Sequence, residues 1–122
     1  MFDSNNNCLI YDWQTLVPDH PILDLAMIVC TGVNPENIQD WIEELLGNYY
    51  RKFESTLLKC EITEVPFSLE ELSDLFFKTG IFMSFLITIE NYEEIYQYDE
   101  PSKQRFLWQL KESIKAHPEF FQ

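Results

Sequence analysis

Residues 9 to 26 read Leu-Ile-Tyr-Asp-Trp-Gln-Thr-Leu-Val-Pro-Asp-His-Pro-Ile-Leu-Asp-Leu-Ala and contain two acids in informative places. Asp12 follows an apolar run that suits a strand, and it leads into a connection marked by Pro18 and Pro21. Asp24 stands twelve residues later inside an apolar run, where an unpaired buried charge would be costly and a dedicated partner is expected. Two acids placed in this way suggest a metal-phosphate site.

The composition is typical of one small domain with a hydrophobic core. Ten Phe, six Tyr and three Trp among 122 residues are the opposite of a disordered composition. The 21 acidic residues outnumber the 8 basic ones and give a net charge of −13, which repels phosphate backbones and anionic lipid surfaces. We therefore expect no nucleic acid and no membrane among the partners.

The cysteines and the apolar segments indicate a cytoplasmic protein. Cys8, Cys30 and Cys60 are odd in number and fit neither a zinc motif nor a small disulfide framework, so reduced thiols are expected. The N-terminus lacks the basic and apolar regions of a signal peptide. The longest apolar stretch, residues 81–89, is far shorter than the ~20 residues that span a bilayer, and we predict that it forms a buried core helix.

The pattern along the chain predicts a mainly α fold with a short N-terminal β-hairpin over residues 1–11. A nearly all-apolar helix is expected from Ile22 to Thr31-Gly32, with glycine as its C-cap. Asn34-Pro35 is a strong start for a second, amphipathic helix of about six or seven turns. Its apolar stripe, at steps of three and four, comprises Ile38, Trp41, Ile42, Leu45, Leu46, Tyr49, Phe53 and Leu57.

Two further helical regions are expected in the second half. Ser68-Leu-Glu-Glu71 is a capping box, and Thr79-Gly80 is a point where the helix that it opens can kink or break. The inner side of that helix should carry Leu69, Leu72, Leu75 and Phe76. A last helix is expected from Pro101 to about Ala116, ended by His117-Pro118, with its inner side formed by Phe106, Leu107, Leu110 and Ile114.

Three segments together resemble a known family: Ile10-Tyr-Asp-Trp-Gln, the proline-bearing loop, and Asp24-Leu-Ala followed by helices. They are similar to the C-terminal lobe of the choline-kinase-like (CHK) small-molecule kinases. That group includes the ecdysteroid-kinase-like proteins and belongs to the aminoglycoside phosphotransferase superfamily, which has a protein-kinase-like fold. The resemblance covers residues 1–122 in helix order and implies a partial kinase domain.

The resemblance implies roles for several side chains. Asp12 matches the acid that holds Mg²⁺ against the ATP phosphates, a task that suits a hard oxygen ligand. Asp24 matches the acid that supports the catalytic loop by accepting hydrogen bonds from its backbone. Tyr92, Tyr96 and Trp108 fall in a region that contributes to the acceptor pocket in related kinases, although ordinary helix packing explains them as well. The acceptor in the family is a small-molecule alcohol or amino alcohol.

The sequence also departs from the family. The chain has no His-Gly-Asp catalytic loop, no glycine-rich cover and no N-terminal lobe with its phosphate-binding Lys, and all three are needed for phosphoryl transfer. Two readings stay open: a kinase C-lobe that is inactive by itself, or a non-catalytic helical interaction module that pairs with a full-length kinase. On the first reading, an exposed apolar surface around Leu9, Tyr11, Trp13 and Ile22 should meet the missing parts or a protein partner.

Overall fold

The computed structural model describes residues 20–90 and 99–122, and these residues form helices and turns without any strand. The elements are α1 (Ile22–Gly32), the 3-10 turn η2 (Pro35–Asn37), α2 (Ile38–Lys59), α3 (Leu69–Leu75), the π-helical turn η3 (Phe76–Gly80), α4 (Ile81–Glu90), α6 (Glu100–Ala116) and the 3-10 turn η4 (Pro118–Phe121). The mainly α prediction is confirmed. The predicted hairpin lies outside the described residues.

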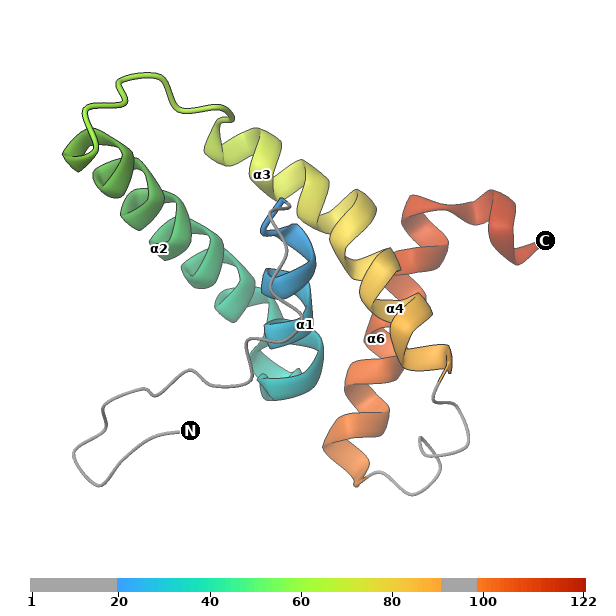
Figure 1. Cartoon of the computed structure of the whole chain (residues 1–122). Coiled ribbons are helices and arrows are strands. Elements are labelled where there is room, and N and C mark those ends of the chain that lie inside the picture. The colour runs from blue at the N-terminus through green and yellow to red at the C-terminus, as the bar shows by residue number, and fades with distance from the viewer. Residues whose placement is uncertain (1–19, 91–98) are drawn as a thin grey trace, which may run out of the picture.

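Helix α1 is the centre of the fold. It packs against α2 on one side and against η3, α4 and α6 on the other, as Figure 1 shows. Ala26 and Val29 are fully buried, and the other buried side chains of α1 are Ile22, Leu25 and Cys30. The expectation that this helix is buried on most sides is confirmed, and only a narrow outer strip, which includes Ile28, faces solvent.

Two sequence expectations for α1 are corrected. The C-cap is Val33 in an extended conformation (φ −87°), and no glycine among the described residues has the positive φ of a left-handed cap. The helix end is instead closed by hydrogen bonds, because Val33 N donates to Val29 O (3.4 Å) and Arg105 Nη1 donates to Val33 O (3.1 Å). Ile22 was expected on an exposed surface but is 6% exposed. Leu9, Tyr11 and Trp13 lie outside the described residues.

Helix α2 begins and ends close to its predicted limits. The Asn34 side chain accepts a hydrogen bond from Glu36 N (3.1 Å), which caps the turn that leads into the helix, and the 22 residues make about six turns. Of the predicted apolar stripe, only Ile38, Ile42 and Leu46 are fully buried, and all three lie in the first half of the helix. Trp41 belongs to the predicted stripe but is 51% exposed.

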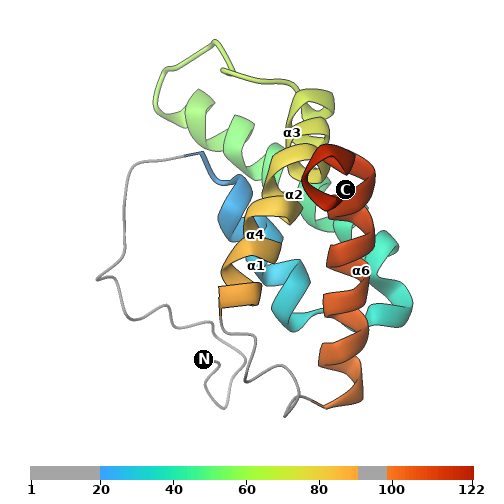
Figure 2. The same cartoon turned by 90° about the vertical axis from the view of Figure 1, so that its right-hand side faces the viewer.

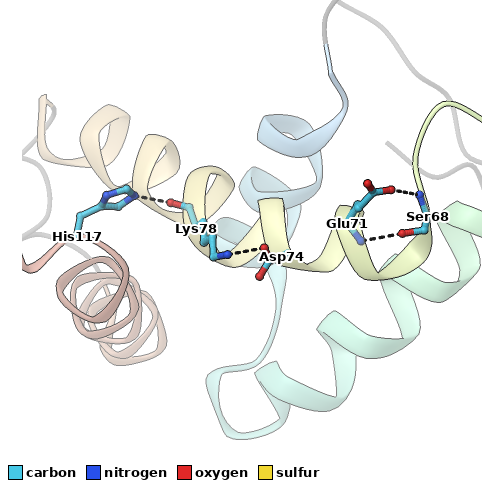
Figure 3. A network of polar contacts seen from close by, with 5 residues as sticks. All are labelled: Ser68, Glu71, Asp74, Lys78 and His117. Atoms are coloured by element: carbon cyan, nitrogen blue, oxygen red, sulfur yellow. Dashed lines mark hydrogen bonds and ion pairs between the residues drawn. The ribbon is translucent and has the colours of Figure 1, made fainter.

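Helices α3 and α4 form one continuous 22-residue helix through the π turn η3. The capping box is present, since Glu71 N donates to Ser68 Oγ (3.1 Å) and Ser68 N donates to the Glu71 carboxylate (2.7 Å; Figure 3). The break expected at Thr79-Gly80 is this π turn, Phe76–Gly80, which widens the helix without ending it. Leu72 and Phe76 are buried as predicted, whereas Leu69 is exposed.

The continuous helix Leu69–Glu90 is longer than the apolar stretch seen in the sequence. It is long and apolar enough to cross a membrane by length and composition, with a mean hydropathy of 1.5 in its most apolar window, of which 33% is buried. Ile81, Ser84 and Phe85 pack inward, as expected of a core helix. The prediction of a buried helix is wrong for Met83, Leu86 and Ile89, which are exposed.

The inward face of helix α6 agrees only in part with the prediction, since Phe106 and Leu110 are half-buried. Its fully buried residues are Gln109 and Ser113, while Leu107 and Ile114, which were expected inside, are 52% and 40% exposed. Figure 2 shows the helix running alongside α4 and α1. At its C-terminal end, His117 Nε2 donates to Lys78 O of the π turn (2.5 Å; Figure 3). This bond ties the end of α6 to η3.

Candidate functional site

Asp24 lies in the first turn of α1, on its outward strip. The side chain is exposed, and no hydrogen bond or ion pair of its carboxylate occurs within residues 20–90 and 99–122. The inference that its place in an apolar run buries the charge is therefore wrong, because a helix of period 3.6 can turn one position outward while Leu25 and Ala26 remain in the core. The positive end of the α1 dipole favours an acid here.

An aromatic cluster lies next to this end of α1. It is built by Tyr49, Tyr50 and Phe53 of α2, by Phe67 of the α2–α3 connection, and by His20. Phe53 stacks between its neighbours, with ring centroids 5.9 Å from Tyr49 and 5.2 Å from Phe67. His20 packs against Phe67 in a tilted arrangement, with ring centroids 5.1 Å apart. The cluster forms an apolar wall beside the exposed acid.

The acid and the wall also interact electrostatically. Burial, and then the negative charge of Asp24, raise the pKa of Tyr49 above its usual value. A phenol is protonated at neutral pH even at its ordinary pKa, and the raised pKa of Tyr49 keeps it so, which leaves the phenol able to donate a hydrogen bond. An exposed carboxylate, a protonated phenol and aromatic faces can together hold a donor-bearing or cationic group, but they contain no activated nucleophile.

The other candidate residues are distributed as follows. Asp12, Tyr92 and Tyr96 lie outside the described residues, so the structure does not place them. Trp108 is in α6, half-buried, and packs against the hydrophobic core. In the part of the chain that the structure describes, no group of three or more His, Cys, Asp or Glu side chains could hold a metal ion.

A cavity that sequence reasoning missed lies between α1, α4 and α6. It has a volume of about 260 Å³, and its walls are formed by Met27, Cys30, Thr31, Ile87, Thr88, Ser102, Arg105, Phe106 and Gln109. Burial raises the pKa of the Cys30 thiol, against the lowering effect of hydrogen bonds from Ser84 and Gln109 and of the Arg105 charge. The signal in the sequence was the spacing of Ser102, Arg105, Gln109 and Ser113 at steps of three and four, a polar stripe at helical period.

Comparison with known proteins identifies a family. A family model described as "Uncharacterized oxidoreductase dhs-27" matches residues 3–116. Neither a curated protein nor a solved structure matches the chain. Because the matched segment covers nearly the whole sequence, the chain belongs to the family described as uncharacterized oxidoreductase dhs-27.

Proposed function

We propose that this chain is the helical C-terminal part of a phosphotransferase-type domain. Complete domains of the type it resembles pass the γ-phosphate of ATP to a hydroxyl of a small molecule. The observation that carries the proposal is the position of Asp24, an exposed acid on the first turn of the most buried helix, twelve residues after Asp12. An acid anchored on a rigid core helix is well suited to hold a neighbouring backbone segment through hydrogen bonds.

In this proposal the two acids have different tasks. Asp12 supplies a carboxylate to Mg²⁺, which neutralises the ATP phosphates during transfer. Asp24 positions backbone and touches neither metal nor substrate. The acceptor is a small-molecule alcohol or amino alcohol, as in the family that the sequence resembles.

The word "oxidoreductase" in the family description gains no support from the glycines of this chain. A common dinucleotide site needs a strand, a glycine-rich turn and a helix. The three glycines of the sequence, Gly32, Gly47 and Gly80, are scattered, and each lies within a helical element. We therefore favour the phosphotransferase relationship.

The chain alone should not catalyse phosphoryl transfer, because the base loop and the glycine-rich cover are not in its sequence. Incubation with ATP, Mg²⁺ and ethanolamine as the acceptor probe, followed by ³¹P NMR, should leave the γ-phosphate signal unchanged. A matched sample with an active small-molecule kinase shows that product is detectable. A phosphoethanolamine signal from the chain alone would refute this part of the proposal.

A second candidate is a non-catalytic helical module that pairs with a full-length kinase of the same type. It is favoured by the outer side of the C-terminal region, where Leu107, Ile114 and Phe120 are exposed. Single polar substitutions, Leu107→Gln and Ile114→Gln, should then weaken association with such a kinase in analytical ultracentrifugation. Glu100→Gln, at an exposed polar position of the same helix, is the control. Equal association of all the variants would remove this candidate.

A further inference from the structure

An apolar pocket lies on the outer surface, between the C-terminal half of α1 and the first half of α2. It has a volume of about 330 Å³, and its walls are formed by Ile28, Gly32, Val33, Asn34, Trp41 and Leu45. Ile28 of α1 is 53% exposed and Trp41 of α2 is 51% exposed, so each helix contributes one large apolar side chain that contacts water. An apolar pocket with such a rim is typical of an interaction site.

The start of α2 surrounds this pocket with negative charge. Residues 34–47 contain no basic residue and four acids, Glu36, Asp40, Glu43 and Glu44. All four are exposed, and none forms an ion pair within residues 20–90 and 99–122. Asp40 and Glu44 are four residues apart on the helix and repel each other, a repulsion that a cationic partner would relieve. The pocket therefore suits an apolar side chain that is flanked by positive charge.

The outer face of α6 has the complementary chemistry. Of the 8 basic residues in the sequence, four lie in α6, namely Lys103, Arg105, Lys111 and Lys115. Leu107 is 52% exposed, and Lys103 and Lys111 lie four residues before and after it, so the three side chains follow one another along one side of the helix. Neither of these two lysines forms an ion pair in the part of the chain that the structure describes.

The pocket and the outer face of α6 lie on different sides of the molecule. Figure 1 shows α2 and α6 on either side of α1, and Leu107 is on the face of α6 opposite the buried Gln109 and Ser113. One chain therefore cannot place its own Leu107 in its own pocket, whereas a second copy can. A contact between two different surfaces is heterologous, and it leaves one surface of each kind free at the ends of the assembly.

We propose that copies of this chain associate head to tail, with Leu107 of one copy in the α1–α2 pocket of the next and the lysines of α6 against the acids of α2. The net charge of −13 repels a second copy at long range. At physiological ionic strength the Debye length is about 8 Å, so charges on distant surfaces are largely screened while charges in contact still attract. The contact does not rest on the phosphotransferase relationship and requires no kinase.

Sedimentation equilibrium of the full chain, in about 0.15 M salt, tests the association. The average mass should rise steadily with protein concentration up to about 1 mM, because a heterologous contact does not stop at two copies. Leu107→Gln removes the inserted side chain and Trp41→Gln removes the pocket rim, so each should weaken association at least tenfold. Leu58→Gln, at an exposed leucine near the other end of α2, should associate like the parent chain.

Mixing the two deficient variants tests the head-to-tail geometry. The Leu107→Gln chain keeps an intact pocket, and the Trp41→Gln chain keeps an intact α6 face. An equimolar mixture should therefore form a complex of one chain of each kind, with the affinity of the parent contact and with no growth beyond two chains. Circular dichroism of each variant checks that both are folded before mixing.

Two variants with the same net charge test the role of the lysines. Lys111→Glu places an acid beside Leu107 and should weaken association at least threefold. Lys52→Glu, at an exposed position in the second half of α2, changes the net charge by the same amount and should weaken association less. Equal effects of the two substitutions would show that only net charge matters, which would overturn the charge pairing between α6 and α2.

The remaining outcomes also decide the matter. A parent chain that stays monomeric up to about 1 mM would refute the association. Undiminished association of Trp41→Gln alone, or of Leu107→Gln alone, would show a contact that does not join the pocket to α6. A mixture of the two folded variants that stays monomeric would refute the head-to-tail arrangement. Because these experiments contain this chain alone, their failure is distinguishable from a failure to pair with a kinase.

Discussion

Single residues at the starts of two helices stabilise the local structure of this chain by capping. Ser68 and Glu71 cap α3 reciprocally, and Asp99 caps α6 by accepting from Ser102 N (2.9 Å). Hydrogen bonds to Ser68, backbone first, lower the pKa of Glu71 below 4.5, and hydrogen bonds to Ser102 lower the pKa of Asp99 below 3.8. Both carboxylates are thus held in their charged forms by the helix ends that they cap.

The capping carboxylates predict that the stability of the fold decreases at acidic pH. A carboxyl with a lowered folded-state pKa stabilises the fold above its unfolded pKa, and that stabilisation is lost as the pH falls through the folded value. Glu71→Gln keeps the side-chain shape but removes the titration, so its urea midpoint should fall less than that of the parent chain between pH 6 and pH 3. Glu70→Gln, a neighbour on the exposed side, should match the parent chain. Equal acid loss in the parent chain and Glu71→Gln would contradict the capping role.

Cys30 and Cys60 should differ in reactivity because only one is buried. Burial raises the pKa of Cys30, so the reactive thiolate is scarcer at pH 8 as well as shielded. Iodoacetamide should modify Cys60 in the folded chain and Cys30 only after unfolding in urea. Peptide mass spectrometry reads each site separately. Modification of Cys30 as fast as Cys60 under native conditions would contradict its burial.

At the scale of elements, the π turn contacts α1 closely at Gly80. A Cβ at Gly80 would lie 3.0 Å from Ile22 O and 3.3 Å from Ala26 Cβ. The backbones of η3 and α1 approach closely only because this position lacks a side chain. Gly47, in the middle of α2, has no atom within 4 Å of such a Cβ.

The two glycines therefore predict opposite effects of the same substitution. Gly80→Ala should destabilise the fold by about 1–3 kcal/mol, because the clash is with backbone and buried side chains. Gly47→Ala should stabilise it by about 0.5–1 kcal/mol, because alanine loses less entropy than glycine in a helix. Thermal unfolding followed by circular dichroism measures both. A neutral Gly80→Ala would show that η3 and α1 do not approach as closely as the structure indicates.

Local features of the fold could be predicted from the sequence, whereas features that depend on contacts between distant segments could not. Signals that act within a few residues were sufficient for the helix starts at Asn34 and Ser68 and for the interruption before Ile81. The inward face of α6 was predicted wrongly at Leu107 and Ile114, because apolar spacing alone favoured these positions. The hydrogen bonds of Arg105 to Val33 and of Gln109 to Cys30 span more than 70 residues of sequence, and no local pattern reveals them.

At the scale of the whole molecule, the buried helix α1 contributes residues to two separate sites. The first turn of α1 presents Asp24 beside the aromatic wall of α2, and the later turns carry Cys30 and Thr31 on the cavity closed by α4 and α6. The sequence, through the family resemblance, pointed to Asp24 as a functional acid, but it did not predict that the side chain is exposed. It did not predict the cavity, because that depends on how three helices separated along the chain pack together.

The claim that most needs testing is that Asp12 is a metal-binding acid. Mn²⁺ titration of the ¹⁵N-labelled chain, followed by paramagnetic broadening, reports where a divalent cation binds. Because the chain has 21 acidic residues, the informative quantity is the difference between the parent chain and Asp12→Asn. Asp40→Asn, at an exposed acid of α2, is the matched control.

We predict that low Mn²⁺ concentrations broaden the amides of residues 10–14 first, that Asp12→Asn abolishes this effect, and that Asp40→Asn preserves it. Broadening spread evenly over the acidic surface, and unchanged in Asp12→Asn, would contradict the proposed relationship to phosphotransferases.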